Sequence, residues 1–210
     1  MIHVDVEQGS KAWIDARLGK PTSSNFHKIV TKKGALSSQS VDYACKLIAE
    51  EILGYSLDEY VSEFMERGTE LEQKAVDYYQ FQTGVEVSEV GFCLTDDRKV
   101  GASPDRLVGK RGLLEIKCPG SEGVHVRNIL GDVDEKHKPQ TQGQVWVCER
   151  DWVDILSFHP EMPPALVRVE RDEEYIGLLK EHIGGRFVEQ LKGLKEAAEK
   201  KIGGSVNLTF

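Results

Sequence analysis

The stretch 101–120, GASPDRLVGKRGLLEIKCPG, contains two short apolar segments on either side of a polar turn. Residues 106–109 and 113–118 have the length and composition of strands, and residues 110–112 between them favour a hairpin turn. The pattern therefore predicts an antiparallel pair of strands near the centre of the chain.

This hairpin would bring acidic and basic side chains together. Residues two apart on a strand face the same side, so Glu115 and Lys117 share one face and Ile116 points to the other. Asp105 comes directly before the first strand and would lie beside the face of Glu115 once the strands pair. Two carboxylates and a lysine are therefore expected to converge at a sheet edge.

A set of this kind suits phosphodiester hydrolysis. Mg²⁺ prefers carboxylate and carbonyl oxygens and keeps several waters, and two such ions about 3.5–4 Å apart can clamp an in-line displacement. A carboxylate inside the apolar segment LLEIKC is costly to bury without compensation, which a bound cation provides. A solvated, charged strand face is the alternative interpretation. The order Pro104-Asp105, then Glu115-Ile116-Lys117, matches the PD-(D/E)xK nuclease signature.

Further polar side chains lie on either side of this segment. The helical stretch 61–82 carries Glu70 and Glu72, either of which could add a third carboxylate; the alternative is a solvated helix face with an Arg67–Glu70 pair. A later helical stretch carries three glutamines that could donate hydrogen bonds to a phosphate or to a metal-bound water: Gln140, Gln142 and Gln144.

The rest of the chain alternates between helical and extended patterns. Apolar spacing predicts helices over residues 11–19, 22–31, 39–53, 61–82, 121–130, 136–149 and 173–201. Extended segments are expected over residues 85–94, 100–102, 106–109, 113–118, 151–160 and 165–172. This order indicates an α/β fold with a central mixed β-sheet flanked by helices. We expect one domain over residues 1–201 and a flexible tail over residues 202–210.

Two of these helices have a clear apolar face. The helix over 39–53 is predicted to bury a face made of Val41, Ala44, Cys45, Ile48 and Ile52, and Gly54 favours its end. The C-terminal helix is predicted to bury Leu178, Ile183, Phe187, Leu191 and Leu194.

Composition is that of an ordinary globular protein and excludes collagen-like, disordered and disulfide-scaffold classes, with 40% hydrophobic and 30% charged residues among 210. The formal net charge of −8 is not the basic balance typical of nucleic-acid binders. A DNA enzyme of this composition is therefore expected to gather Lys and Arg along a channel on an otherwise acidic body.

The four cysteines lie far apart in the sequence, at Cys45, Cys93, Cys118 and Cys148. This spacing does not suit a zinc ribbon or an iron–sulfur cluster, so we expect reduced thiols. The N-terminal residues lack the apolar segment of a secretory signal, and no apolar run approaches the ~20 residues of a membrane span. We expect a cytoplasmic protein without membrane association.

Several segments, in order, resemble the lambda exonuclease family of YqaJ-type viral recombinases, within the PD-(D/E)xK nuclease superfamily. The resemblance runs from about residue 5 to about residue 195 and rests on VEQGSKAWIDARLGKPTSS, RGTELEQKAVDYYQFQTGVEV, GASPDRLV, LLEIKCP, QTQGQVWV and VRVERDEEY. It implies the restriction-endonuclease-like fold.

The resemblance also implies an activity: Mg²⁺-dependent 5′→3′ exonuclease action on double-stranded DNA, with release of mononucleotides and a 3′ single-stranded overhang for annealing-based recombination. It implies two Mg²⁺ ions in each active site, with Mn²⁺ as a substitute, and a preference for 5′-phosphorylated ends. The implied partners are a single-strand annealing protein and two further copies in a ring-shaped trimer. A bacterial host and a phage or prophage origin follow from the same resemblance.

The resemblance assigns roles to individual residues. Asp105, Glu115 and the Ile116 carbonyl match metal ligands, Lys117 matches the catalytic lysine, and Glu72 matches the helix carboxylate, with Glu70 as a weaker option. The positions that match the 5′-phosphate and DNA-binding pocket are Arg17, Ser24, Ser103 and Gln140, with Gln142 as a further candidate. Met65 lies where a wedge for strand separation would sit, although a core methionine is the alternative, and Trp13 is expected to pack rather than stack on a base.

Two other functions remain open at this level. One is a different nuclease of the same superfamily, such as a restriction-type endonuclease or a RecB-like module. The other is a DNA-end-binding recombination scaffold without catalysis, against which the presence of Asp105, Glu115 and Lys117 argues.

Overall fold

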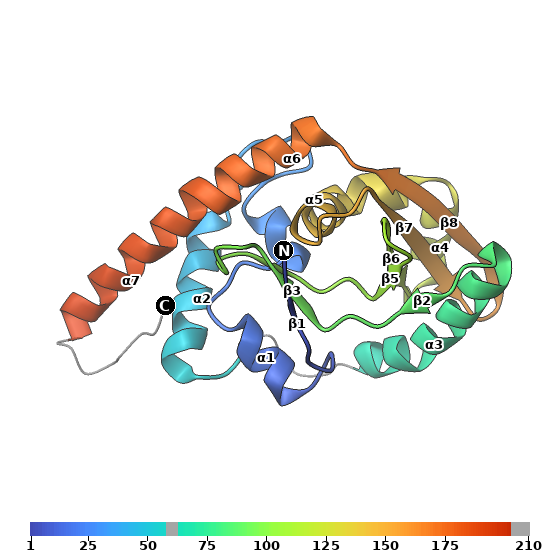
Figure 1. The fold of residues 1–210 in the computed structure, drawn as a ribbon, viewed down its shortest axis with the longest axis horizontal. Coiled ribbons are helices and arrows are strands. Elements are labelled where there is room, and N and C mark those ends of the chain that lie inside the picture. Colours follow the sequence, from blue (N-terminus) through green and yellow to red (C-terminus); the bar gives the residue numbers. More distant parts are fainter. Residues whose placement is uncertain (58–62, 203–210) are drawn as a thin grey trace.

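The computed structural model describes residues 1–57 and 63–202, with the side chains of this part except those of 63–70, 133–136 and 202. A five-stranded β-sheet with strand order β2-β5-β6-β7-β8 lies at its centre (Figure 1). The strands are β2 (Val87–Ser88), β5 (Arg106–Val108), β6 (Gly112–Lys117), β7 (Trp152–His159) and β8 (Met162–Glu170). Because β6 and β7 are parallel and the other pairs antiparallel, the sheet is mixed, as the sequence predicted.

Helices cover both faces of this sheet (Figure 1). On one face, α3 (Glu63–Thr83) contributes Ala75 and Tyr79 to a cluster with Leu114 of β6. On the other, α5 (Asp132–Val147) contributes Val145 to a cluster with Leu113 of β6. Successive residues of β6 therefore point to opposite helical layers, which confirms the predicted α/β architecture.

Further helices and a second sheet complete the fold. The helices are α1 (Lys11–Arg17), a 3₁₀ helix (Ser23–Lys28), α2 (Ser40–Leu53), α4 (Glu122–Ile129), α6 (Glu173–Leu179), a π-helix (Lys180–Phe187) and α7 (Val188–Ile202). A small second sheet has the order β1-β3-β4, with β1 (Ile2–Val4), β3 (Phe92–Leu94) and β4 (Gly101–Ala102). The predicted C-terminal helix is thus one continuous helical run with a π-helical centre.

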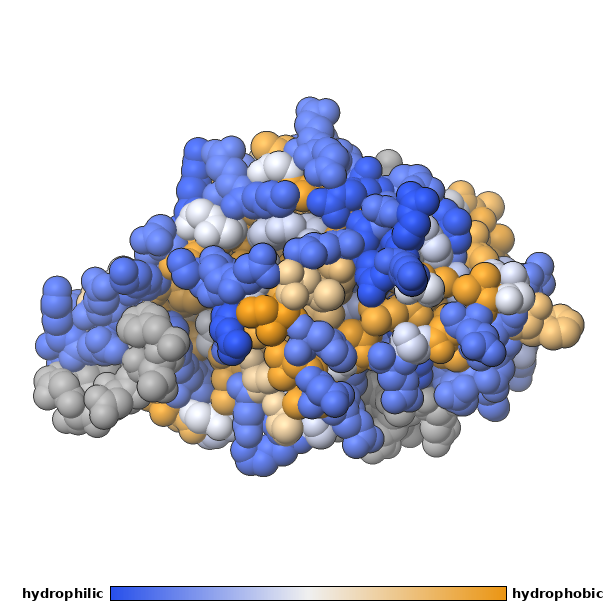
Figure 2. All heavy atoms as spheres, viewed as in Figure 1, coloured by the Kyte–Doolittle hydropathy of each residue, from blue (hydrophilic) through white to orange (hydrophobic). Residues whose placement is uncertain are grey.

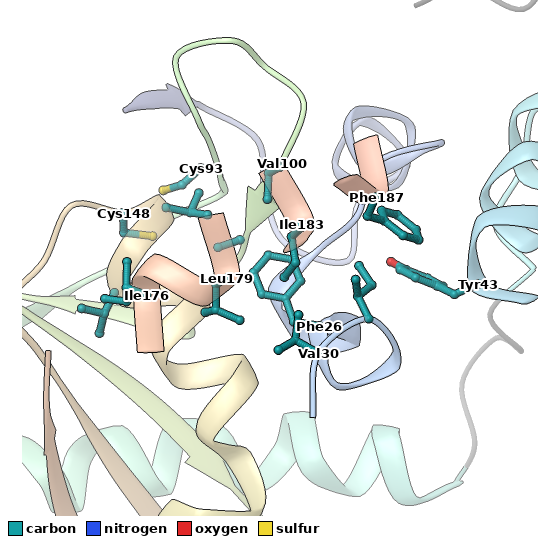
Figure 3. Close-up of a cluster of buried hydrophobic side chains, with 14 of the residues drawn as sticks. Phe26, Val30, Tyr43, Cys93, Val100, Cys148, Ile176, Leu179, Ile183 and Phe187 are labelled. Carbon is teal, nitrogen blue, oxygen red and sulfur yellow. The ribbon is translucent and has the colours of Figure 1, made fainter. Parts of the chain in front are cut away.

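The main core lies where α2, α5 and the C-terminal helices meet (Figure 3). Tyr43 of α2 stacks on Phe187 of the π-helix with ring centroids 5.7 Å apart. Cys93 and Cys148 lie side by side in the same core (Figure 3). All four cysteines are free thiols, but Cys45 is exposed.

The expected apolar face of α2 was wrong at three positions. Val41 is 49% exposed, Ile52 is 36% exposed and Cys45 is exposed, whereas Tyr43 and Leu47 are buried. The reason is tertiary, because α2 packs with its Tyr43 side against Phe187 of the C-terminal helical run.

Two contacts fix the layers that carry the site. Tyr79 of α3 donates a hydrogen bond of 2.7 Å to the buried Asp154 carboxylate of β7, which anchors α3 to the sheet. Gly143 allows α5 to approach the 3₁₀ helix so closely that a Cβ there would overlap the ring of Phe26.

The surface in Figure 2 is largely hydrophilic, with smaller apolar areas between the polar residues. Across residues 1–57 and 63–202, none of the helices combines the length and the apolar character needed to cross a membrane.

Candidate active site

Asp105 and Glu115 lie next to each other across the β5–β6 hairpin. The register pairs Arg106 with Leu114, so the residue before Arg106 lies beside the residue after Leu114. Asp105 Oδ2 accepts a hydrogen bond of 2.5 Å from the backbone N–H of Ile116. The convergence predicted from the hairpin pattern is therefore present.

Glu115 is the most enclosed carboxylate of this group, with 4% of its surface exposed. Its Oε1 accepts hydrogen bonds of 2.6 Å from Lys117 Nζ and from Gln140 Nε2, and its Oε2 accepts one of 2.6 Å from Gln144 Nε2. Gln140 Oε1 in turn accepts from Lys117 Nζ at 3.2 Å. One face of α5 thus holds Glu115 and Lys117 in a fixed arrangement.

The electrostatics of this group favour a bound cation. Burial, and then the nearby charge of Glu115, raise the pKa of Asp105 well above its ordinary value. Burial lowers the pKa of Lys117, but Glu115 and Asp105 outweigh it, so the pKa of Lys117 is raised and the ammonium stays protonated. Two adjacent carboxylates, one of them reluctant to ionise, form a place where positive charge is stabilising.

Glu72 reaches the same edge from α3. Its Oε1 accepts a hydrogen bond of 2.6 Å from Arg106 Nη1, and the same nitrogen donates to the backbone carbonyl of Asp105 at 2.6 Å. The negative charge of Glu72 also contributes to the raised pKa of Asp105, behind larger effects of burial and Glu115. Glu72 therefore lies at the same edge as Asp105.

A second polar group lies two residues upstream of Asp105. Arg17 Nη1 donates to Ser103 Oγ at 3.1 Å, and Trp13 Nε1 donates to the same oxygen at 3.0 Å. The Arg17 guanidinium also lies over the Trp13 ring, 4.0 Å from its centroid. Trp13 thus packs against and orients Arg17.

Ser24 lies close to this group through the start of the 3₁₀ helix. Thr22 forms an isolated bridge to Gly101 of β4, and the Thr22 and Ser24 hydroxyl oxygens are 3.3 Å apart. Ser24 is exposed. The structure therefore brings Arg17 and Ser103 into direct contact and places Ser24 on the adjoining surface.

Residues 12–151 match the YqaJ-like viral recombinase domain. The chain belongs to this family.

Solved structures of other exonucleases resemble this YqaJ-like protein. An alkaline exonuclease from Laribacter hongkongensis, LHK-Exo, is 32% identical with a TM-score of 0.81, over 92% of this chain and 98% of that one. Its complex with dAMP is 33% identical with a TM-score of 0.83, over the same shares of both chains. A phage-related exonuclease from Haemophilus somnus 129PT is 18% identical over 83% of this chain and 96% of that one; its TM-score of 0.66 shows the shared fold alone. No curated protein sequence matched the chain. Family and relatives together identify this YqaJ-like protein as a nuclease.

The remaining candidate residues have different positions. Gln142 does not face the carboxylates, because it lies two residues from Gln140 on the other side of α5; its side chain bonds the backbone of Glu170 and Asp172 at 2.8 and 2.9 Å. Gln144, one turn after Gln140, contacts Glu115 instead. The side chains of Glu70 and Met65 lie outside the described residues.

In this YqaJ-like nuclease Arg106 also contacts the carboxylate group, although its sequence pattern did not single it out. The available signal was its position, since it follows Asp105 directly at the start of a strand. Alternation along that strand turns Arg106 to the layer of α3 while Asp105 faces Glu115, so Arg106 can contact Glu72.

The donor set fits a hard divalent cation. In the described part of the chain, no three His, Cys, Asp or Glu side chains are arranged as a metal site. Mg²⁺ does not require one, because it is held by one or two carboxylates and keeps several waters. Asp105 and Glu115, with the Ile116 carbonyl between Glu115 and Lys117 in the sequence, are the residues that would hold it.

Proposed function

We propose that this nuclease is a Mg²⁺-dependent 5′→3′ exonuclease on double-stranded DNA. It would degrade the 5′-ended strand processively to mononucleotides and leave a 3′ overhang for single-strand annealing. The observation that carries the proposal is the position of the Arg17–Ser103 pair, because Ser103 lies two residues before Asp105, which in turn lies beside Glu115. An anion site beside a cation site suits a terminal phosphate followed by a scissile phosphodiester.

Arg17 would bind the terminal 5′-phosphate. A planar guanidinium offers several N–H donors and matches phosphate oxygens better than an ammonium does. Ser103 and Ser24 would add hydroxyl donors, and Trp13 keeps the guanidinium oriented. Anchoring the end of the strand would place the next phosphodiester over the carboxylates and disfavour internal cleavage.

Asp105 and Glu115 would hold two Mg²⁺ ions, for which Mn²⁺ can substitute. Cations bound there would neutralise the negative charge that develops on the scissile phosphate. Glu72 would complete the carboxylate set. The protonated Lys117, held by Glu115 and Gln140, would orient the attacking water or donate to the phosphate oxygens.

The chemistry of the cut supports repeated action from one end. Water would attack the phosphorus between the first two nucleotides, the bond from phosphorus to the 3′ oxygen would break, and that oxygen would take a proton. The released nucleotide keeps its own 5′-phosphate, and the shortened strand again starts with one. Arg17 would therefore meet the same group in every cycle. LHK-Exo, a relative, was crystallised with dAMP, a mononucleotide of this product class.

The proposed context follows from the family. We infer that the protein forms a ring-shaped homotrimer around DNA and works with a single-strand annealing protein. We also infer that its gene is of phage or prophage origin and that the protein acts in the cytoplasm of the bacterial host.

End-labelled linear duplex with 5′-phosphate or 5′-hydroxyl ends tests the proposal, alongside covalently closed circular duplex. We expect Mg²⁺-dependent release of mononucleotides from the 5′-phosphorylated ends, no cleavage of the circle, and no activity with EDTA or in Asp105→Ala. A sizing measurement on the same preparation should give about three times the 23.5 kDa of one chain.

Three results would contradict the proposal. Cleavage of the closed circle would support an endonuclease instead. Binding of ends without hydrolysis would support a scaffold. Full resection by the Asp105→Ala variant would remove the site from the reaction.

A further inference from the structure

Arg106 is a largely covered cation between the Glu72 carboxylate and the backbone of Asp105, and it has no role in the reaction proposed above. Its side chain is 14% exposed. Its Nη1 donates to Glu72 Oε1 and to the Asp105 carbonyl, both at 2.6 Å. One nitrogen therefore ties helix α3 to the strand that begins after Asp105.

We propose that Arg106 is a positioning residue that holds Glu72 beside Asp105 and acts on the reaction only through Glu72. This inference rests on the proposed function. The Arg106 guanidinium donates hydrogen bonds to two protein oxygens and is largely covered, which argues against a direct role in gripping DNA.

Charge explains why such a residue is needed. Glu72, Asp105 and Glu115 gather at one edge, where their negative charges repel one another. Without a cation at its side, Glu72 would be more stable turned toward solvent, away from the other two carboxylates. Its side chain is already 32% exposed, so this movement is open to it. Arg106 compensates this repulsion at Glu72, the carboxylate that comes from helix α3 and not from the β5–β6 hairpin.

Geometry explains why the anchor lies on β5. Tyr79 fixes α3 to the sheet through Asp154, but this contact lies two helical turns beyond Glu72. Arg106 provides a second point of attachment at the level of the site. With both contacts in place, the helix carboxylate has a defined distance from the hairpin.

The test is a double-mutant cycle with Arg106→Gln, Glu72→Gln and both together. Turnover and KM for 5′-phosphorylated ends are measured at saturating Mg²⁺, and Mg²⁺-induced thermal stabilisation is measured without DNA. We expect each single change to lower turnover about 10- to 100-fold, as for residues that orient metal ligands. KM should change less than about threefold, and the double variant should be no worse than the more impaired single variant.

Mg²⁺ binding, followed by thermal stabilisation, should also be non-additive. The Mg²⁺ concentration for half-maximal stabilisation should rise in Arg106→Gln and should rise no further in the double variant. Arg106→Lys keeps the charge and should retain most of the turnover. Arg186→Gln is the matched control, because Arg186 pairs with Glu181 at 2.6 Å far from the site, and it should leave every readout unchanged.

Independent losses in the double variant would overturn the inference, as would an effect of Arg106→Gln mainly on KM. If Arg106→Gln does not fold, the same cycle with Arg106→Met carries the test, because Met removes both hydrogen bonds and keeps an unbranched side chain, and the expectation of non-additivity is the same. A wild-type protein without Mg²⁺-dependent 5′→3′ activity would instead refute the proposed function, so the two failures are distinguishable.

Discussion

Asp105 differs from the other two carboxylates of the site in its partners. Glu72 is paired with Arg106 and Glu115 with Lys117, whereas Asp105 is held by the backbone N–H of Ile116. Within the described residues, no Lys or Arg side chain forms an ion pair with Asp105. This residue therefore has the strongest need for a bound cation.

Replacing Asp105 by Asn should stabilise the metal-free protein at neutral pH. Burial and Glu115 raise the pKa of Asp105 in the folded state above its ordinary value of 3.8. The folded state then holds a proton that the unfolded state releases, so stability falls as pH rises from about that value through the raised pKa. Asn carries no charge and escapes this loss, while its Oδ1 can still accept from Ile116.

Thermal unfolding with EDTA and with Mg²⁺ checks this expectation. The wild-type protein should gain stability with Mg²⁺, and Asp105→Asn should gain little. A variant that is less stable than wild type in EDTA at pH 7, or that responds equally to Mg²⁺, would show that Asp105 is not a strained metal ligand.

Arg17→Ala should remove the preference for 5′-phosphorylated ends. Hydrogen bonds to a charged phosphate are worth about 1.5–3 kcal/mol, so cleavage of phosphorylated ends should fall about 10- to 100-fold. Hydroxyl ends should be affected much less, and Mg²⁺ stabilisation should remain. The measurement is the ratio of cleavage rates on the two kinds of end. Undiminished discrimination in the variant would show that Arg17 does not read the phosphate.

At the scale of elements, α5 connects the chemistry to the core. Gln140 and Gln144 on one face hold Glu115, while Gly143 on another lets the helix approach Phe26 in the 3₁₀ helix before α2. The same close contact keeps the segment that carries Ser24 near the site. The glycine is therefore a packing requirement at this position.

Gly143→Ala should destabilise the protein, whereas Gly193→Ala in α7 should stabilise it. A Cβ at residue 143 would overlap the ring of Phe26, and overpacking costs about 1–3 kcal/mol, more than the ~1 kcal/mol gained in helix propensity. Residue 193 has open space, so Ala should add about 0.5–1 kcal/mol. Urea unfolding of both variants measures the two free energies, and equal signs would contradict the packing argument.

At the scale of the whole molecule, the charge of −8 does not exclude work on DNA. Part of the acidity lies at the edge formed by Glu72, Asp105 and Glu115, where bound cations would reverse the local sign. Arg17 lies beside this edge and would provide positive charge there for the DNA end that we propose it binds. Local arrangement, not the total charge, therefore decides what the molecule can bind.

The elements were largely predictable because their signals are local. The hairpin at 106–117, the stop of α2 at Gly54 and the burial of Ile183, Phe187 and Leu191 in the C-terminal helix followed from alternation, turn residues and helical spacing. The apolar face of α2 did not, since its orientation depends on Phe187, far away in the sequence. The domain boundaries and the residue roles remain predictions.

The sequence by itself determined the mixed α/β fold, and the spacing from Asp105 to Lys117 determined which carboxylates meet, because strand alternation is a property of the local backbone. Only the tertiary structure decided that Arg106 bridges to Glu72, that Gln144 and not Gln142 holds Glu115, and that Arg17 bonds Ser103. These contacts join residues from different layers, 34, 29 and 86 positions apart. Their partners depend on how helices rotate and pack on the sheet, which local spacing does not encode.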